Sequence, residues 1–131
     1  MSTVITGGKM TRLLYVDDEL DILLVVKKGL ENYGFSVDVA TSAEVALLMD
    51  LPSYDMIIID IRMPKINGFQ FYDAIKNRIN SGKTKVCFFT AFTTYQEEYQ
   101  RRFPTWNGCY FITKPMSVKV LAEKLRELLQ S

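Results

Sequence analysis

The chain contains no histidine, and this absence excludes several kinds of chemistry. Of its 131 residues none is His and only two are Cys. Without histidine there is no Ser-His or Cys-His nucleophile pair, and the usual zinc sites lose a principal ligand. Cys87 and Cys109 lack a metal-binding spacing, and two cysteines make no disulfide framework. Both lie in apolar stretches, so we expect reduced core residues, and any chemistry must use carboxylates, hydroxyl groups and lysine.

The sequence also lacks a strong excess of charge and any long apolar run. Sixteen Lys and Arg residues against fifteen Asp and Glu give a net charge of +1, so nothing favours nucleic acid or an anionic membrane as a direct partner. No apolar run approaches the ~20 residues needed to span a bilayer, and residues 1–10 have no secretory-signal core. We expect a cytoplasmic protein with a disordered leader over residues 1–10 and a single domain over residues 11–131.

Short apolar runs alternate along the chain with amphipathic stretches. Strands are predicted at 12–16, 35–40, 56–59, 85–89 and 109–113. Helices are predicted at 21–33, 41–51, 68–80, 94–103 and 117–129. Strict alternation of this kind implies a parallel sheet with helices on both faces. The predicted fold class is therefore α/β, with a five-stranded parallel sheet flanked by five helices.

The third predicted strand ends in a carboxylate. Three consecutive isoleucines precede Asp60, and β-branched residues without polar interruption indicate a strand buried on both faces. Pro64 and then Asn67-Gly68 break the chain before the next helix. A carboxylate at the carboxyl end of a buried strand lies where open α/β sheets bind their ligands. Taken alone, Asp60 has an ordinary alternative as the first residue of a loop.

Polar residues also end three other predicted strands. Asp17-Asp18 follow the first strand, Thr90 closes the fourth and Lys114 follows the fifth. Each has a structural explanation of its own, but the carboxyl ends of parallel strands meet at one edge, so these side chains are expected to converge with Asp60. Three clustered carboxylates require a cation, and oxygen ligands suit Mg²⁺. A carboxylate beside Mg²⁺ and a lysine is a nucleophile toward a phosphoryl group and yields an aspartyl-phosphate.

With these motifs the chain resembles the response-regulator receiver domain of two-component signalling. The resemblance extends from residue 11 to residue 129, with the motifs in the family's order and similar spacing. It implies a flavodoxin-like, doubly wound sheet with strand order 2-1-3-4-5 and a receiver domain over residues 11–131. The matching segments are Val16-Asp17-Asp18-Glu19, Asp60-Ile61-Arg62-Met63-Pro64-Lys65-Ile66-Asn67-Gly68, Thr90-Ala91 and Lys114-Pro115.

The resemblance implies a role for each residue of the cluster. Asp60 would accept a phosphoryl group from a histidine kinase. Asp18 would bind Mg²⁺ directly and Asp17 through water, with Asp60 and the backbone carbonyl of Arg62 as further ligands. Lys114 would pair with the phosphoryl group.

The resemblance also implies a switch. Thr90 would move toward the phosphoryl group, together with an aromatic residue that is Phe111 here instead of the frequent tyrosine. The residues two beyond Asp60 and Thr90 are Arg62 and Phe92, positions that influence access of water to the phosphate. We hypothesise that these bulky side chains slow autodephosphorylation.

Aromatic residues gather in the last third of the chain. They favour a partner or self-dimer surface on the face formed by the fourth helix, fifth strand and fifth helix, where receivers generally signal. Core packing is an equally open interpretation, since residues four apart form one stripe of a helix. The candidate surface residues are Tyr95, Tyr99, Trp106 and Tyr110.

The sequence thus predicts a phosphorylation-activated signalling switch, either a stand-alone receiver or an excised receiver domain. It is expected to have no enzymatic activity beyond self-catalysed phosphotransfer and autodephosphorylation. One alternative is a Mg²⁺-dependent phosphohydrolase that acts through an aspartyl-phosphate. Against it, Arg62 stands where a second catalytic acid would be expected, and the chain offers no cap domain for a substrate. A phosphorelay intermediate is a further open alternative.

Overall fold

A five-stranded parallel sheet forms the centre of the protein. The computed structural model describes residues 5–6, 9–79, 83–105, 109–114 and 116–130. The sheet order is β4-β3-β5-β6-β7, and each neighbouring pair is parallel. This order confirms the predicted doubly wound α/β fold with strand order 2-1-3-4-5. The strands are β3 (Arg12–Val16), β4 (Ser36–Ala40), β5 (Met56–Ile59), β6 (Lys85–Thr90) and β7 (Cys109–Thr113).

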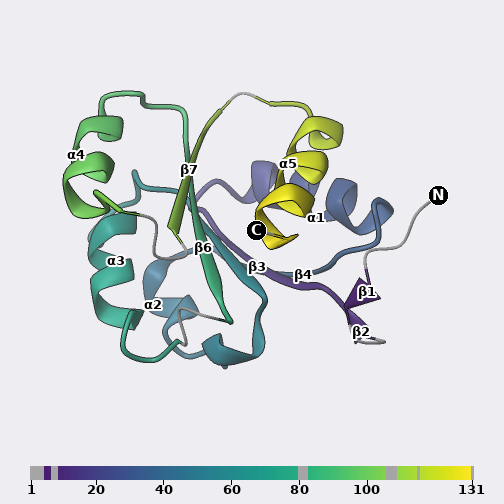
Figure 1. Ribbon diagram of the computed structural model, residues 1–131. Helices are drawn as coiled ribbons and strands as arrows, with labels where there is room; N and C mark the ends of the chain where they lie inside the picture. Colours follow the sequence, from purple (N-terminus) through teal and green to yellow (C-terminus); the bar gives the residue numbers. More distant parts are fainter. Residues whose placement is uncertain (1–4, 7–8, 80–82, 106–108, 115, 131) are drawn as a thin grey trace.

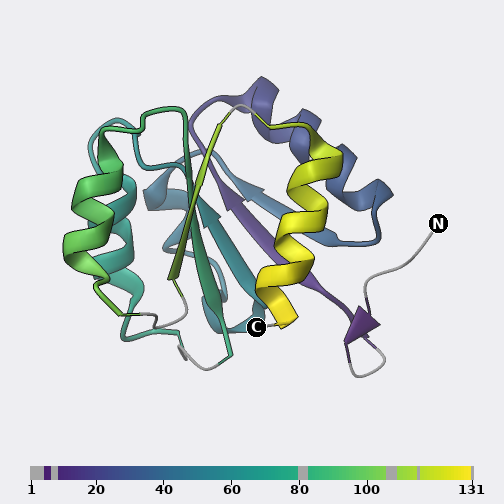
Figure 2. The ribbon, with the colours of Figure 1, turned by 45° about the horizontal axis from the view of Figure 1, so that its top comes forward.

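Helices cover both faces of this sheet (Figures 1 and 2). α1 (Leu20–Asn32) and α5 (Val118–Gln130) pack on one face. α2 (Ala43–Ala46), α3 (Gly68–Ile75) and α4 (Tyr95–Arg102) pack on the other. In the part of the chain that the structure describes, no helix has the length and apolar character needed to cross a bilayer.

The isoleucine strand β5 lies at the middle of the sheet and is buried on both sides. Ile57 and Ile59 belong to the core under α2, α3 and α4, whereas Met56 and Ile58 belong to the core under α1 and α5. All four side chains are fully buried. Successive side chains of a strand point to opposite faces, so an uninterrupted apolar run fills both cores at once.

Two helices are shorter than the sequence predicts. α2 ends at Ala46 instead of continuing to residue 51, and a 3₁₀ turn, Leu51–Ser53, follows it. The guanidinium group of Arg78 donates to the carbonyl oxygens of Leu47 and Met49, at 3.0 and 3.4 Å. The carbonyl oxygen of Met49 also accepts from the N–H of Leu51 at 3.0 Å, and that of Leu47 would have an internal partner if α2 continued to residue 51. α3 likewise ends early, at Ile75. The chain turns there, with the N–H of Arg78 bonded to the carbonyl oxygen of Ile75 at 2.7 Å, and this turn brings Arg78 within reach of the segment after α2.

Four of the first ten residues, where a disordered leader is expected, belong to the part of the chain that the structure describes. The described residues among them form two short strands, β1 (Ile5–Thr6) and β2 (Lys9–Met10). They pair antiparallel, with Thr6 opposite Lys9. The other residues of the expected leader lie outside the described part of the chain, so the leader stays a prediction.

The loop between β5 and α3 returns tightly toward the strand that it leaves. The backbone N–H of Gly68 donates to the carbonyl oxygen of Ile61 at 2.7 Å. At the start of α3, Asn67 and Gln70 form a reciprocal capping box, which fixes the first turn of the helix. A Cβ atom on Gly68 would lie 2.7 Å from the carbonyl oxygen of Asp60. The close return of the loop therefore requires glycine and helps to fix the backbone of Asp60.

Replacing Gly68 by alanine is expected to destabilise the protein by about 2–3 kcal/mol, because the new methyl group meets backbone atoms that cannot move aside. Gly29→Ala is a matched control, since the three atoms nearest its Cβ would all belong to the side chain of Val118, the closest at 2.5 Å. A side chain can adjust, so this variant should lose less. Urea unfolding measures both, and a Gly68→Ala protein as stable as Gly29→Ala would contradict the expectation.

Candidate functional site

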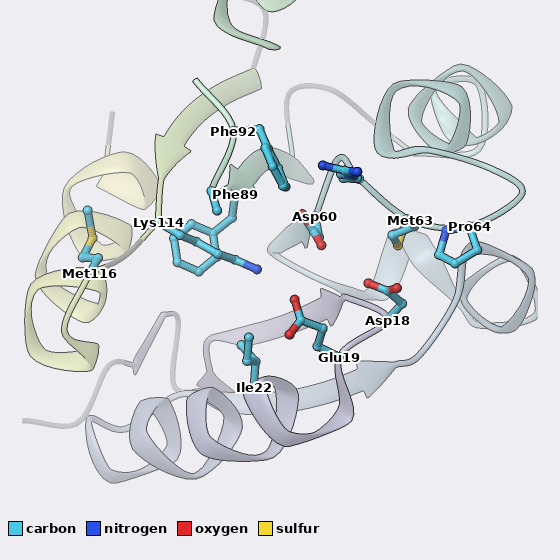
Figure 3. A pocket seen from close by; sticks show the side chains of 12 residues that line it. Asp18, Glu19, Ile22, Asp60, Met63, Pro64, Phe89, Phe92, Lys114 and Met116 are labelled. Carbon is cyan, nitrogen blue, oxygen red and sulfur yellow. The ribbon is translucent and has the colours of Figure 1, made fainter. Parts of the chain in front are cut away.

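A pocket lies at the carboxyl edge of the sheet, where β3, β5, β6 and β7 end. Its volume is about 790 Å³. Figure 3 shows the side chains of Asp18 and Glu19, from the loop after β3, pointing into this space together with those of Asp60 and Lys114, which follow β5 and β7. The predicted convergence of strand-end residues is therefore present. The pocket is lined by Asp18, Glu19, Ile22, Asp60, Arg62, Met63, Pro64, Phe89, Ala91, Phe92, Lys114 and Met116.

Three carboxylates meet at this pocket. Asp17, Asp18 and Asp60 each offer a carboxylate oxygen, and these oxygens lie within 4.8 Å of one another. Asp17 is fully buried and Asp60 is 6% exposed, whereas Asp18 is open to solvent. Burial and the charge of Asp17 raise the pKa of Asp60 from its ordinary value of 3.8 to about 7, although Lys114 acts in the opposite direction. The cluster therefore carries an unfavourable concentration of negative charge.

Asp17 is held by three hydrogen bonds. Its Oδ2 accepts from the ammonium group of Lys114 at 2.7 Å and from the hydroxyl of Tyr15 at 2.8 Å. Its Oδ1 accepts from the backbone N–H of Glu19 at 3.0 Å. Burial and the neighbouring charge of Asp17 raise the pKa of Tyr15 well above its ordinary range, so its hydroxyl remains a donor at neutral pH. Asp17 thus has a donor on each oxygen despite its complete burial.

Thr90 and Lys114 are joined through the backbone. The N–H of Lys114 donates to the carbonyl oxygen of Thr90 at 2.7 Å, in continuation of the pairing between β6 and β7. Thr90 is fully buried, and its hydroxyl accepts from the N–H of Phe92 at 3.2 Å. The ammonium group of Lys114 lies 5.2 Å from the ring centroid of Phe89, a cation–π distance. Thr90 is therefore a buried neighbour of the pocket, while Lys114 reaches into it.

Arg62 and Phe92 form a pair across the pocket. The guanidinium carbon of Arg62 lies 4.5 Å from the ring centroid of Phe92, within the range of cation–π attraction. Arg62 comes from the loop after β5 and Phe92 from the loop after β6, and both line the pocket. Both positions were expected to influence access of water to the phosphate, but the sequence does not predict their contact, because they lie thirty positions apart.

The candidate partner residues lie in two surroundings. Tyr99, Tyr110 and Phe111 line a groove of about 300 Å³ between α4, β7 and α5. The ring of Phe111 lies 5.3 Å from that of Tyr99. Tyr95 instead packs against Phe92, with ring centroids 6.3 Å apart. Trp106 lies outside the described residues. Core packing and surface exposure thus coexist here, because Tyr95, Tyr99, Tyr110 and Phe111 are each partly buried.

Two polar residues at the site, Glu19 and Tyr15, were not among the predicted site residues. Glu19 lines the pocket beside Asp18, and the matched motif already contained it. The sequence predicts Tyr15 only as part of the strand at 12–16. Residues two apart on a strand point to the same face, so the position of Tyr15 before Asp17 was a usable signal for its contact with that carboxylate.

The acidic cluster fits a divalent cation. Asp17, Asp18 and Asp60 offer only oxygen atoms, the ligands that Mg²⁺ takes in proteins. A cation among them would offset the repulsion that raises the pKa of Asp60. The donor set lacks the sulfur and imidazole ligands typical of zinc sites. The site is therefore compatible with Mg²⁺.

Comparison with known proteins agrees with this geometry. The chain is 29% identical over 120 residues to response regulator SaeR of Staphylococcus aureus, and the match covers 92% of this chain and 51% of SaeR. The chain thus spans about half the length of that relative. The solved structure of response regulator TrrA of Thermotoga maritima, in complex with Mg²⁺-BeF, is 30% identical with a TM-score of 0.76; the match covers 91% of this chain and 99% of TrrA.

A second solved structure has the same fold. The chemotaxis protein CheY4 of Vibrio cholerae is 24% identical, with a TM-score of 0.77, over 91% of this chain and 98% of that one. The family model of the response regulator receiver domain matches residues 13–126. With the sheet order and the acidic pocket, this match shows that the chain belongs to the response regulator receiver domain family.

Proposed function

We propose that this protein is a phosphorylation-activated signalling switch that accepts a phosphoryl group on Asp60. The observation that carries the proposal is the placement of a nearly buried carboxylate among two further aspartates and a lysine, all at one edge of the sheet. A histidine kinase is the proposed donor, since the family belongs to two-component signalling. Asp60 attacks the phosphorus atom, and the bond to the donor's histidine nitrogen breaks as the aspartyl-phosphate forms.

Mg²⁺ is the proposed cofactor. Asp18 and Asp60 would hold it directly and Asp17 through water, with the backbone carbonyl of Arg62 as a further ligand. The cation supplies positive charge that offsets the charge on the transferring oxygens. The ammonium group of Lys114 supplies a second positive charge, because it already projects into the same pocket. That the TrrA structure contains Mg²⁺-BeF supports the assignment by analogy.

Phosphorylation would be transmitted to the groove between α4, β7 and α5. The hydroxyl of Thr90 would turn from the N–H of Phe92 toward the phosphoryl group, and Phe111 would change its packing against Tyr99. Such a change shifts a pre-existing equilibrium that a partner can recognise. We propose this groove, with Tyr110 on its wall, as the surface for a downstream protein or a second copy of the chain.

Incubation with Mg²⁺ and acetyl phosphate is expected to add a single phosphoryl group, because one carboxylate has the required surroundings. Intact mass spectrometry measures the addition, and the Asp60→Asn variant should remain unmodified. Failure of the wild-type protein to gain a phosphoryl group would contradict the proposed function. Release of many phosphate ions per protein molecule would instead indicate a phosphohydrolase.

Stability should depend on pH through Asp60. The carboxyl group has a pKa of about 7 in the folded protein, against an ordinary value of 3.8. Its stabilising contribution is therefore complete below about pH 4 and is lost as the pH rises through about 7. Asp60→Asn removes this loss and should raise the free energy of unfolding by about 1–3 kcal/mol at pH 8, but by less at pH 5.

Urea unfolding at both pH values, with and without Mg²⁺, measures this effect. Bound Mg²⁺ should reduce the difference in the free energy of unfolding between the wild-type protein and Asp60→Asn at pH 8, because the cation stabilises the carboxylate that only the wild-type protein has. A difference that is the same at pH 5 and pH 8 would argue against the raised pKa of Asp60.

The pair of Arg62 and Phe92 should lengthen the lifetime of the aspartyl-phosphate by limiting the approach of water. In the double variant Arg62→Ala, Phe92→Ala the half-life should shorten by about tenfold, or roughly 1.4 kcal/mol of barrier. Arg102→Ala is a matched control, because its guanidinium stacks on Phe69 at 4.9 Å, outside the pocket. Decay of the phosphorylated protein is followed by mass, and an unchanged half-life in the double variant would refute the role.

A further inference from the structure

Tyr15 places a hydroxyl group in the core directly against the site. The residue lies on β3, is fully buried, and packs its ring 6.2 Å from that of Phe89. Its hydroxyl donates to Oδ2 of Asp17 at 2.8 Å. An apolar side chain would fill the same position in the core under α1 and α5. The hydroxyl therefore adds a polar contact that packing alone does not need.

The oxygen that Tyr15 contacts is shared with Lys114. Oδ2 of Asp17 accepts from both groups, at 2.8 and 2.7 Å, while Oδ1 accepts from the N–H of Glu19. The side chain of Asp17 is fully buried, and that of Lys114 is 13% exposed. If Lys114 moved to a phosphoryl group on Asp60, it would leave this oxygen. Without another donor, a buried charged oxygen would then be left unsatisfied, which is costly.

We propose that Tyr15 is a positioning residue that permits Lys114 to transfer from Asp17 to the phosphoryl group. The inference rests on the proposed function, because it concerns the same transfer of Lys114. The Tyr15 hydroxyl remains on Oδ2 of Asp17 when the lysine departs, so the buried carboxylate keeps a donor on each oxygen. It also fixes the orientation of the carboxylate. Tyr15 thereby lowers the cost of moving the lysine without touching the reacting atoms.

The test compares two affinities of the Tyr15→Phe variant. Mg²⁺ alone does not require Lys114 to reach Asp60, whereas beryllium fluoride, which stands in for the phosphoryl group, does. Isothermal titration calorimetry gives the dissociation constant of Mg²⁺ and then that of beryllium fluoride in saturating Mg²⁺. In Tyr15→Phe the dissociation constant of beryllium fluoride should rise by about tenfold, the scale of one lost hydrogen bond to a charged group. The dissociation constant of Mg²⁺ should rise by much less.

Tyr54→Phe is the matched control. Its hydroxyl also donates to an aspartate, Oδ2 of Asp38 at 2.7 Å, but Tyr54 precedes β5 at the opposite edge of the sheet. Loss of this hydroxyl should leave both dissociation constants unchanged. Urea unfolding of the two variants verifies that each is folded under the titration conditions. A weakening of beryllium fluoride binding by Tyr54→Phe as large as that by Tyr15→Phe would overturn the proposal.

A Lys114→Ala background tests the link to the lysine. There, Tyr15→Phe should cause no further loss of beryllium fluoride affinity, and a further tenfold loss would overturn the proposal. Equal losses of Mg²⁺ and beryllium fluoride affinity in the single variant would also overturn it, since they would indicate a general disturbance of Asp17. If the wild-type protein itself fails to bind beryllium fluoride with Mg²⁺, the proposed function fails, and this result is distinct from an unaffected Tyr15→Phe variant.

The wild-type protein offers a measurement that needs no variant. A buried, hydrogen-bonded hydroxyl proton exchanges slowly enough to be followed by NMR. The Tyr15 hydroxyl signal should persist when Mg²⁺ and beryllium fluoride are bound, because the contact with Asp17 is retained. Disappearance of that signal on binding would refute the proposal, even if the Tyr15→Phe variant did not fold.

Discussion

The repulsion among the carboxylates at one edge of the sheet is the constraint on which the site depends. Parallel strands bring Asp17 and Asp60 to the same edge, and the buried isoleucines of β5 keep water away from them. Coulomb repulsion is strong in such a poorly solvated place, so one carboxylate is pushed toward its protonated form. Burial and the charge of Asp17 together raise the pKa of Asp60 to about 7. A cation among the three carboxylates would offset their repulsion.

Two sets of contacts connect the pocket to the rest of the fold. Lys114 neutralises Asp17 through its side chain and is bonded to Thr90 through its backbone, so a change at the ammonium group acts on the end of β6. A separate chain of contacts runs from Arg62 to Phe92 and from Phe92 to Tyr95 on α4. α4 is itself tied to α3 by the ion pair of Arg102 with Asp73 at 3.0 Å. The pocket therefore has physical connections to the helix that borders the groove.

Strand order and strand-end chemistry were predictable because both depend on local patterns. Apolar runs located the strands, and alternation with helices implied the parallel sheet. From these two steps alone, Asp17, Asp60 and Lys114 were expected to converge, and they do. Boundaries that depend on tertiary contacts were less accessible. The early end of α2 is an example, because Arg78, which comes from the turn after α3, donates to the carbonyl oxygens of Leu47 and Met49 just beyond that end.

Side-chain partners across loops could not be read from the sequence, because spacing does not specify which rotamers meet. Arg62 and Phe92 were each assigned an influence on water, yet their mutual contact requires two loops to approach over the pocket. Tyr15 is a different case, since its relation to Asp17 follows from the two-residue period of a strand. The strand predicted over residues 12–16 did not by itself point to this contact. A buried tyrosine hydroxyl needs an acceptor, and an acidic residue two positions away on the same strand face supplies one.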